Sequence, residues 1–135
     1  MKNLRSVLVA LAVLLMATMA RAQESKVAAT IPFDFVAGDR AYPAGDYLLS
    51  NNGPVLQITG AEQTTTTLSH ACENVTPSTT TKLVFRRMGG AYFLRQIWLA
   101  GDLRGRELPR SDSEIRLAQN HEKTEPVVIA ANIVK

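Results

Sequence analysis

Hydrophobic and polar residues alternate along the stretch from Ile31 to Leu49, which reads IPFDFVAGDRAYPAGDYLL. Ile31, Phe33 and Phe35 fall on one face of an extended chain, because successive side chains of a strand point to opposite sides. Pro43-Ala44-Gly45 then supplies the residues of a tight turn, and alternation resumes directly after it. This pattern predicts two strands joined by a turn-rich connection, which form the first part of a sheet with one buried face.

The first of these strands is predicted over Val27–Phe35 and the second over Asp46–Ser50. Pro32 interrupts the first strand and has no N–H to donate to a neighbour. The strand is therefore expected either at a sheet edge or with the Pro32 nitrogen directed away from the adjacent strand.

Five further strands are predicted from β-branched and aromatic residues that lie between turn signals. The strongest signals are Asn52-Gly53 and Gly89-Gly90, because these residues tolerate the positive φ of tight hairpin turns. The threonine-rich Thr64–His70 carries little apolar surface and is expected at an edge. Ala91–Leu99 carries large apolar groups on both faces and is expected in the centre of a sheet. The five strands span Val55–Thr59, Thr64–His70, Lys82–Arg87, Ala91–Leu99 and Val127–Val134.

One short helix is predicted between the last two strands. Ser111-Asp112-Ser113-Glu114 has the pattern of a capping box, in which the serine and the glutamate each bond to a backbone N–H at the helix start. The helix is expected to run to Glu122 and to bury a narrow apolar stripe of Ile115, Leu117 and Ala118. The elements together predict an all-β fold: an antiparallel β-sandwich or a small β-barrel of about seven strands, with one short helix near the C-terminus.

The first residues have the pattern of a cleaved signal peptide. Lys2 and Arg5 precede an uncharged apolar run from Val7 to Met19, and Ala20-Arg21-Ala22 supplies small residues at a cleavage site. Residues 1–22 are therefore expected to be the signal peptide and residues 23–135 a single β-rich domain. No second run is long and apolar enough for a membrane span, so an exported protein of the periplasm or the extracellular space is expected.

Removal of this segment changes the charge of the chain. The whole sequence has 15 Lys and Arg against 12 Asp and Glu, but Lys2, Arg5 and Arg21 belong to the signal peptide. The remaining chain has a formal net charge of zero, which argues against a nucleic-acid partner. Cys72 is the only cysteine, so the fold is expected to hold without an internal disulfide.

Five short motifs are spread over most of the predicted domain: Ile31–Phe35 (IPFDF), Pro43–Tyr47 (PAGDY), Lys82–Phe85 (KLVF), Tyr92–Leu94 (YFL) and Gly105–Pro109 (GRELP). In these motifs the chain resembles small exported proteins of unknown function found in acidobacterial genomes. The resemblance implies an exported β-rich protein and no catalytic or ligand residue.

The chemically reactive residues form no recognisable catalytic or metal motif. His70 and Cys72 share one face of a strand, and His121 is the only other imidazole, but transition-metal sites usually need three or four such ligands at characteristic spacings. We therefore expect no metal, no cofactor and no catalytic residues. One enzymatic alternative remains, a hydrolase that uses carboxylates such as Asp34, Asp46 and Glu107 if these converge in space.

The preferred interpretation is a non-catalytic module of the cell envelope that binds a small ligand or an envelope protein. The charged stretch Gly101–Pro109 follows the most apolar strand, and loops on rigid scaffolds often carry function. Aromatic residues either line a binding surface beside it or belong to the core. The candidate ligand-binding residues are Tyr92, Trp98, Arg104, Arg106 and Glu107. The alternative is a structural surface protein that forms homo-oligomers through the edge strand Thr64–His70.

Overall fold

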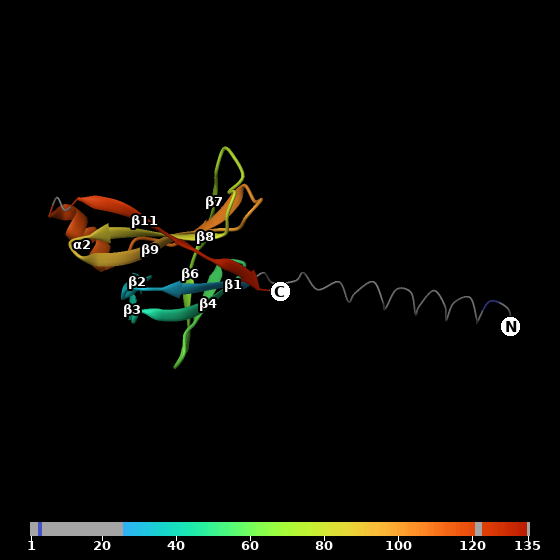
Figure 1. Cartoon of the computed structure of the whole chain (residues 1–135), viewed down its shortest axis with the longest axis horizontal. Helices are drawn as coiled ribbons and strands as arrows, with labels where there is room; N and C mark the ends of the chain where they lie inside the picture. Colours follow the sequence, from blue (N-terminus) through green and yellow to red (C-terminus); the bar gives the residue numbers. More distant parts are fainter. Residues whose placement is uncertain (1–2, 4–25, 121–122, 135) are drawn as a thin grey trace.

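The computed structural model describes residues 3, 26–120 and 123–134, and the strands in this part of the chain form two sheets that face each other (Figure 1). The five-stranded sheet has the order β12-β1-β4-β5-β6. The seven-stranded sheet has the order β11-β8-β9-β10-β7, with the hairpin β2-β3 beside β9. The all-β expectation is confirmed, and the barrel alternative is wrong because the described strands do not close into one sheet.

The number of strands is larger than the seven expected, since twelve lie in the described residues. Every pairing between them is antiparallel except that of β2 with β9. The five-stranded sheet contains β12 (Asn132–Val134), β1 (Lys26–Ile31), β4 (Gly45–Asn52), β5 (Val55–Thr59) and β6 (Thr64–Leu68). The seven-stranded sheet contains β11 (Thr124–Ala130), β8 (Lys82–Met88), β9 (Ala91–Trp98), β10 (Arg104–Glu107), β7 (His70–Glu73), β2 (Phe35–Ala37) and β3 (Arg40–Tyr42).

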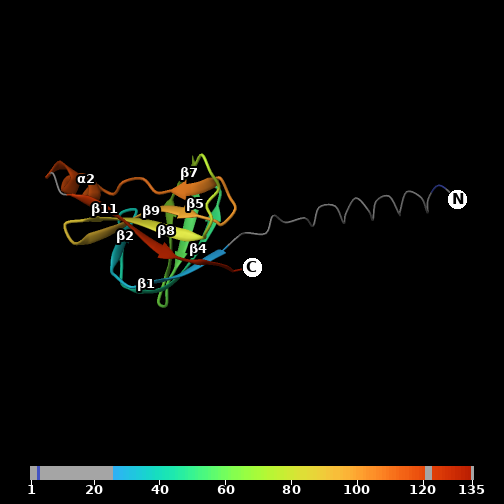
Figure 2. The same cartoon turned by 45° about the horizontal axis from the view of Figure 1, so that its top comes forward.

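Three of the predicted strands are each divided between the two sheets, which explains most of the difference in number. The chain leaves the five-stranded sheet at residues 32–34 and again at Ser69, and it returns at Ala131 after β11 (Figure 2). The predictions Val27–Phe35, Thr64–His70 and Val127–Val134 are therefore wrong as single strands. Each reads as continuous in the sequence because both of its parts are extended segments with apolar or β-branched residues.

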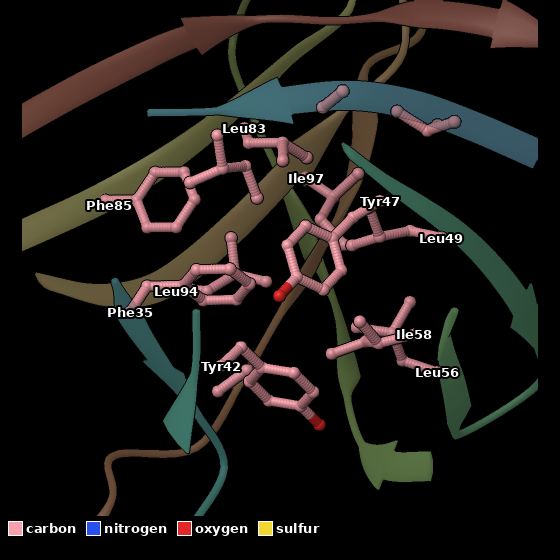
Figure 3. Close-up of a cluster of buried hydrophobic side chains, with 14 of the residues drawn as sticks. Phe35, Tyr42, Tyr47, Leu49, Leu56, Ile58, Leu83, Phe85, Leu94 and Ile97 are labelled. Carbon is pink, nitrogen blue, oxygen red and sulfur yellow. The ribbon is translucent and has the colours of Figure 1, made fainter. Parts of the chain in front are cut away.

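The core lies between the sheets and is built from both of them (Figure 3). Leu49, Leu56 and Ile58 face it from one sheet, and Leu83 and Phe85 from the other, each at most 2% exposed. Aromatic rings fill one end of this core: Phe35 stacks on Tyr42 at 5.1 Å between ring centroids and meets Tyr47 and Phe85 edge-on. Tyr42 and Tyr47 therefore belong to the core rather than to a binding surface.

β9 is central, as its two apolar faces predicted, and it carries a bulge. Val84 of β8 pairs with Gln96 and Phe85 pairs with Leu94, so Arg95 has no partner across the ladder. The other edge of β9 is shared, because β10 pairs with residues 96–98 and β2 pairs at Phe93. Bulges redirect side chains out of the regular alternation, and this one lets β9 bury Leu94, Arg95 and Ile97.

The helix α2 spans Asp112–Gln119 and lies at one end of the molecule (Figure 1). Ser111 is its N-cap and accepts a hydrogen bond from the Glu114 N–H at 3.2 Å, which confirms the predicted start. The predicted apolar stripe is wrong, since Ile115 is 41% exposed and Glu114 is the buried residue of the helix. No helix of the described residues is long and apolar enough to cross a membrane.

Two other predictions concern the charged segment after β9 and residues that lie outside the described part of the chain. Gly101–Pro109, expected to be a loop, contains the strand β10, whose residues 105–107 pair with β9 on one side and β7 on the other. The predicted signal peptide and His121 lie outside the described residues, apart from Asn3.

Candidate binding site

A half-open cavity of about 620 Å³ lies between the two sheets at the ends of β4 and β10. Its apolar wall is formed by residues of both sheets: Val27, Leu49, Leu56, Ile97 and Leu99. Its polar wall comes from the end of β4 and from β10 with the residues just before it: Asn51, Asn52, Asp102, Arg104 and Arg106. The cavity thus combines hydrocarbon on its inner side with amides, guanidinium groups and one carboxylate.

Because side chains alternate between the two faces of β10, both of its arginines point into the space between the sheets. Arg106 pairs with Ile97, a core residue, so Arg104 and Arg106 lie on the inner face. Gly105 and Glu107 lie on the opposite face. There the indole of Trp98 packs so closely on Gly105 that a Cβ at this position would lie 2.7 Å from the ring. The absence of a side chain at Gly105 is what lets Trp98 cover β10.

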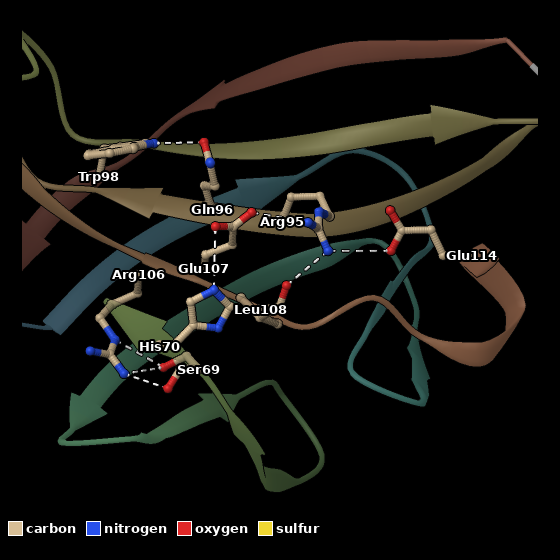
Figure 4. Close-up of polar contacts among 9 residues, drawn as sticks. All are labelled: Ser69, His70, Arg95, Gln96, Trp98, Arg106, Glu107, Leu108 and Glu114. Carbon is tan, nitrogen blue, oxygen red and sulfur yellow. Dashed lines mark hydrogen bonds and ion pairs between the residues drawn. The ribbon is translucent and has the colours of Figure 1, made fainter. Parts of the chain in front are cut away.

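Arg106 holds the crossing of the chain between the sheets. Its Nη2 donates to the Ser69 carbonyl at 2.6 Å and to Ser69 Oγ at 3.0 Å, and its Nε donates to the same hydroxyl at 3.1 Å (Figure 4). Ser69 joins β6 of one sheet to β7 of the other and is itself buried. The guanidinium of Arg106 therefore mainly stabilises the fold, although it borders the cavity.

Arg104 is the more available cation at the cavity. Its Nε lies 3.6 Å from Glu73 Oε1, but the two side chains are 77% and 72% exposed. An ion pair this exposed contributes about 0–1 kcal/mol, so a competing anion can displace it. The backbone N–H of Arg104 donates to Asp102 Oδ1 at 2.9 Å, and this hydrogen bond fixes the start of β10.

The bulge residue Arg95 forms a second polar cluster (Figure 4), in which the side chains of Arg95 and Glu114 are buried and that of Glu107 is 26% exposed. Its Nη1 donates to the Leu108 carbonyl at 2.9 Å and lies 3.7 Å from Glu114 Oε2 of α2. Its Nη2 donates to Glu107 Oε1 at 3.1 Å. The sequence does not predict this cluster, because neither the bulge nor the burial of Glu114 is visible in the pattern of residues. It ties α2 and β10 to the centre of the seven-stranded sheet.

The five predicted ligand-binding residues are divided between these places. Arg104 and Arg106 line the cavity, whereas Glu107 belongs to the cluster around Arg95. Tyr92 stacks on Phe33 at 3.8 Å between ring centroids, and Trp98 is buried against Gly105 with its Nε1 donating to Gln96. The aromatic residues therefore do not gather around the arginines, and the apolar wall is aliphatic instead.

His70, Cys72 and Glu107 share the outer face of the seven-stranded sheet. His70 Nε2 lies 3.5 Å from Glu107 Oε2, with the imidazole 60% exposed. Cys72 faces Gly105 on β10. Among the described residues, no group of three His, Cys, Asp or Glu side chains is arranged to hold a metal ion.

The cysteine is expected to be a poor nucleophile. Burial raises the pKa of the Cys72 thiol, and the negative charge of Glu107 raises that pKa further, although a hydrogen bond with the Gly105 backbone and the charge of Arg106 partly oppose both effects. A raised pKa leaves less thiolate at a given pH, and the thiolate is the reactive form. We expect Cys72 to react more slowly with Ellman's reagent at pH 8 in the native protein than after unfolding in urea, with N-acetylcysteine as the control for the effect of urea. A native rate equal to the unfolded one would contradict this.

The carboxylates considered for hydrolysis have structural partners. Asp34 accepts from the Ala44 N–H at 2.9 Å and so holds the turn before β4. Asp46 accepts from the Thr30 hydroxyl at 2.6 Å across β1 and β4. Glu107 pairs with Arg95. Each of these carboxylates thus has a hydrogen-bond or ion-pair partner within the fold.

Comparisons of the chain with protein-family models, with curated proteins and with solved structures find no match. The residues that line the cavity therefore provide the evidence for its function.

Proposed function

We propose that this protein is an exported, non-catalytic binding module of the cell envelope, and that its cavity takes a small amphipathic anion. The observation that carries the proposal is the position of Arg104, an exposed guanidinium beside a wall of aliphatic side chains. Pockets of about 300–1,000 Å³ with apolar walls and a few polar groups are typical of small-molecule sites. The volume of about 620 Å³ lies within that range.

The polar groups of the cavity favour an acceptor-rich ligand. The guanidinium groups of Arg104 and Arg106 donate, and the Asp102 carboxylate accepts one hydrogen bond, at Oδ1, from the Arg104 backbone N–H. A carboxylate or a similar anion can accept two parallel hydrogen bonds from one guanidinium. An apolar body on the same ligand would lie against Val27 and Leu56 and remove more hydrocarbon surface from water.

No serine, threonine, cysteine or histidine lies among the described residues that line the cavity, which favours binding over hydrolysis there. The side chains on the cavity wall are aliphatic, amide and guanidinium groups, with the single carboxylate of Asp102. Export is part of the proposal because Lys2, Arg5 and the apolar run that follows have the pattern of a signal peptide.

The test is a titration of the purified protein with three probes of equal chain length: octanoate, octanol and octylammonium. We expect octanoate to bind best by isothermal titration calorimetry and to raise the melting temperature. Arg104→Gln is expected to weaken octanoate binding about tenfold, since a hydrogen bond to a charged group contributes about 1.5–3 kcal/mol. Arg116→Gln, on the exposed face of α2, removes an equal charge far from the cavity and should leave the affinity unchanged.

Two results would contradict the proposal. Equal binding of the three probes would show that the charge of the ligand is not recognised. Equal octanoate affinity in the wild type and in Arg104→Gln would show that the anion, if bound, lies elsewhere.

A further inference from the structure

The strand β6 is an open edge of the five-stranded sheet. It pairs with β5 along its whole length, and no described strand pairs with its other side. Its inner face is covered, because Thr65 is hydrogen-bonded to the Tyr42 hydroxyl and Thr67 lies against Gly38. Its outer face is exposed and carries Thr64, Thr66 and Leu68. The outward-directed N–H and C=O groups of β6 are thus a template for another strand.

The other edges carry features that hinder such pairing. β11 contains Pro126, which lacks an N–H, next to Glu125. β12 and β3 have three residues each, and β7 carries the exposed Glu73. Natural sheets protect their edges with charges, prolines and short strands. β6 has five residues, no charge and no proline.

We propose that β6 pairs with β6 of a second copy of this chain, antiparallel and about a two-fold axis at Thr66. In this register Thr66 of one copy faces Thr66 of the other, and Thr65 faces Thr67. The two five-stranded sheets would then form one continuous sheet across the dimer. A two-fold contact of this kind uses the same surface on both copies and closes without further growth.

The sequence around β6 suits a second copy. Residues 63–69 contain no charged side chain, so two copies meet without repulsion. Threonines that face each other across strands can exchange hydrogen bonds, and the chain already makes such a contact between Thr64 and Thr59 of β5 at 3.4 Å. Leu68, 64% exposed, would lie opposite Thr64 of the other copy and pack on its methyl group.

The proposed interface is small, so we expect the two copies to associate weakly. Interfaces below about 1,000 Å² are usually weak or transient. One strand pair of five residues therefore predicts a monomer–dimer equilibrium that shifts with protein concentration. It does not predict a permanent dimer. This inference is independent of the proposed ligand, because β6 does not line the cavity.

Sedimentation velocity over a wide concentration range tests the proposal with two variants that carry opposite charges at position 66. Thr66→Lys and Thr66→Glu each place like charges opposite one another at the two-fold axis, so each variant alone is expected to be monomeric. An equimolar mixture of the two should associate, because lysine then faces glutamate. Gln57→Lys is the matched control: Gln57 pairs with Thr66 from the adjacent strand and is exposed, but it is not at the edge.

The proposal predicts a reversible dimer for the wild type and for Gln57→Lys, with unchanged circular dichroism in all variants. A wild type that stays monomeric at the highest concentration would overturn it. So would a Thr66→Lys variant that associates like the wild type, or a mixture that stays monomeric.

Discussion

Replacing Arg95 with methionine is expected to lower the free energy of unfolding by about 3–5 kcal/mol, the usual cost of removing one partner from a buried ion pair. Arg95 is 9% exposed and lies between Glu107 and Glu114. Methionine fills similar space but leaves both carboxylates without their cation and the Leu108 carbonyl without its hydrogen-bond donor. The cost is largest at Glu114, because its side chain is only 3% exposed and its charge would be left buried.

The measurement is equilibrium denaturation in urea, followed by the fluorescence of Trp98, which is buried and is the only tryptophan of the chain. Arg104→Met is the control, since it removes the same group from an exposed pair and should cost about 0–1 kcal/mol. Arg95→Met combined with Glu114→Gln should recover part of the loss, because the buried charge is removed as well. A similar, small loss in Arg95→Met and Arg104→Met would show that the buried cluster does not stabilise the fold.

Phe85→Ala is expected to have a comparable effect, a loss of about 3–5 kcal/mol. Phe85 is fully buried and stands edge-on to both Phe33 and Phe35, with ring centroids 5.0 and 5.6 Å away. Its removal opens a cavity between the sheets, and the neighbouring rings lose contacts that the rigid strands cannot restore.

Phe33→Ala is the matched control at the border of the same aromatic group, where Phe33 is only partly buried. The same residue change should cost clearly less there, because part of the ring already faces solvent and less hydrocarbon surface is returned to water. The same urea titration measures both variants. Equal losses at the two positions would mean that Phe85 does not occupy the centre of the core.

Local patterns in the sequence predicted several of the strands that stay within one sheet, but not β3 or β10. The predictions Asp46–Ser50 and Lys82–Arg87 fall within β4 and β8, and Val55–Thr59 coincides with β5. The start of α2 at Ser111 was also predicted. These features depend on side-chain alternation, turn residues and capping, which act over a few residues and are therefore readable without the fold.

The candidate site was predicted in part. Arg104 and Arg106 stand on either side of Gly105 in a charged segment, and their direction into the cavity follows from the alternation of β10. The aliphatic wall opposite them was not predicted, because Val27, Leu49 and Leu56 meet β10 only when the two sheets pack together. Buried aliphatic residues carry no local sign of which cavity they border.

The sequence by itself thus determined an all-β chain, the positions of β4, β5, β8 and β9, the cap of its helix and the two arginines that line the cavity. The tertiary structure decided where the chain crosses between sheets, as at Ser69, where Arg106 from a distant strand holds the crossing. It also decided the burial of Arg95 and Glu114, which the apolar pattern of the helix did not suggest. These features depend on pairing between segments far apart in the chain. Alternation fixes which face a side chain takes, but it does not fix the sheet to which the strand belongs.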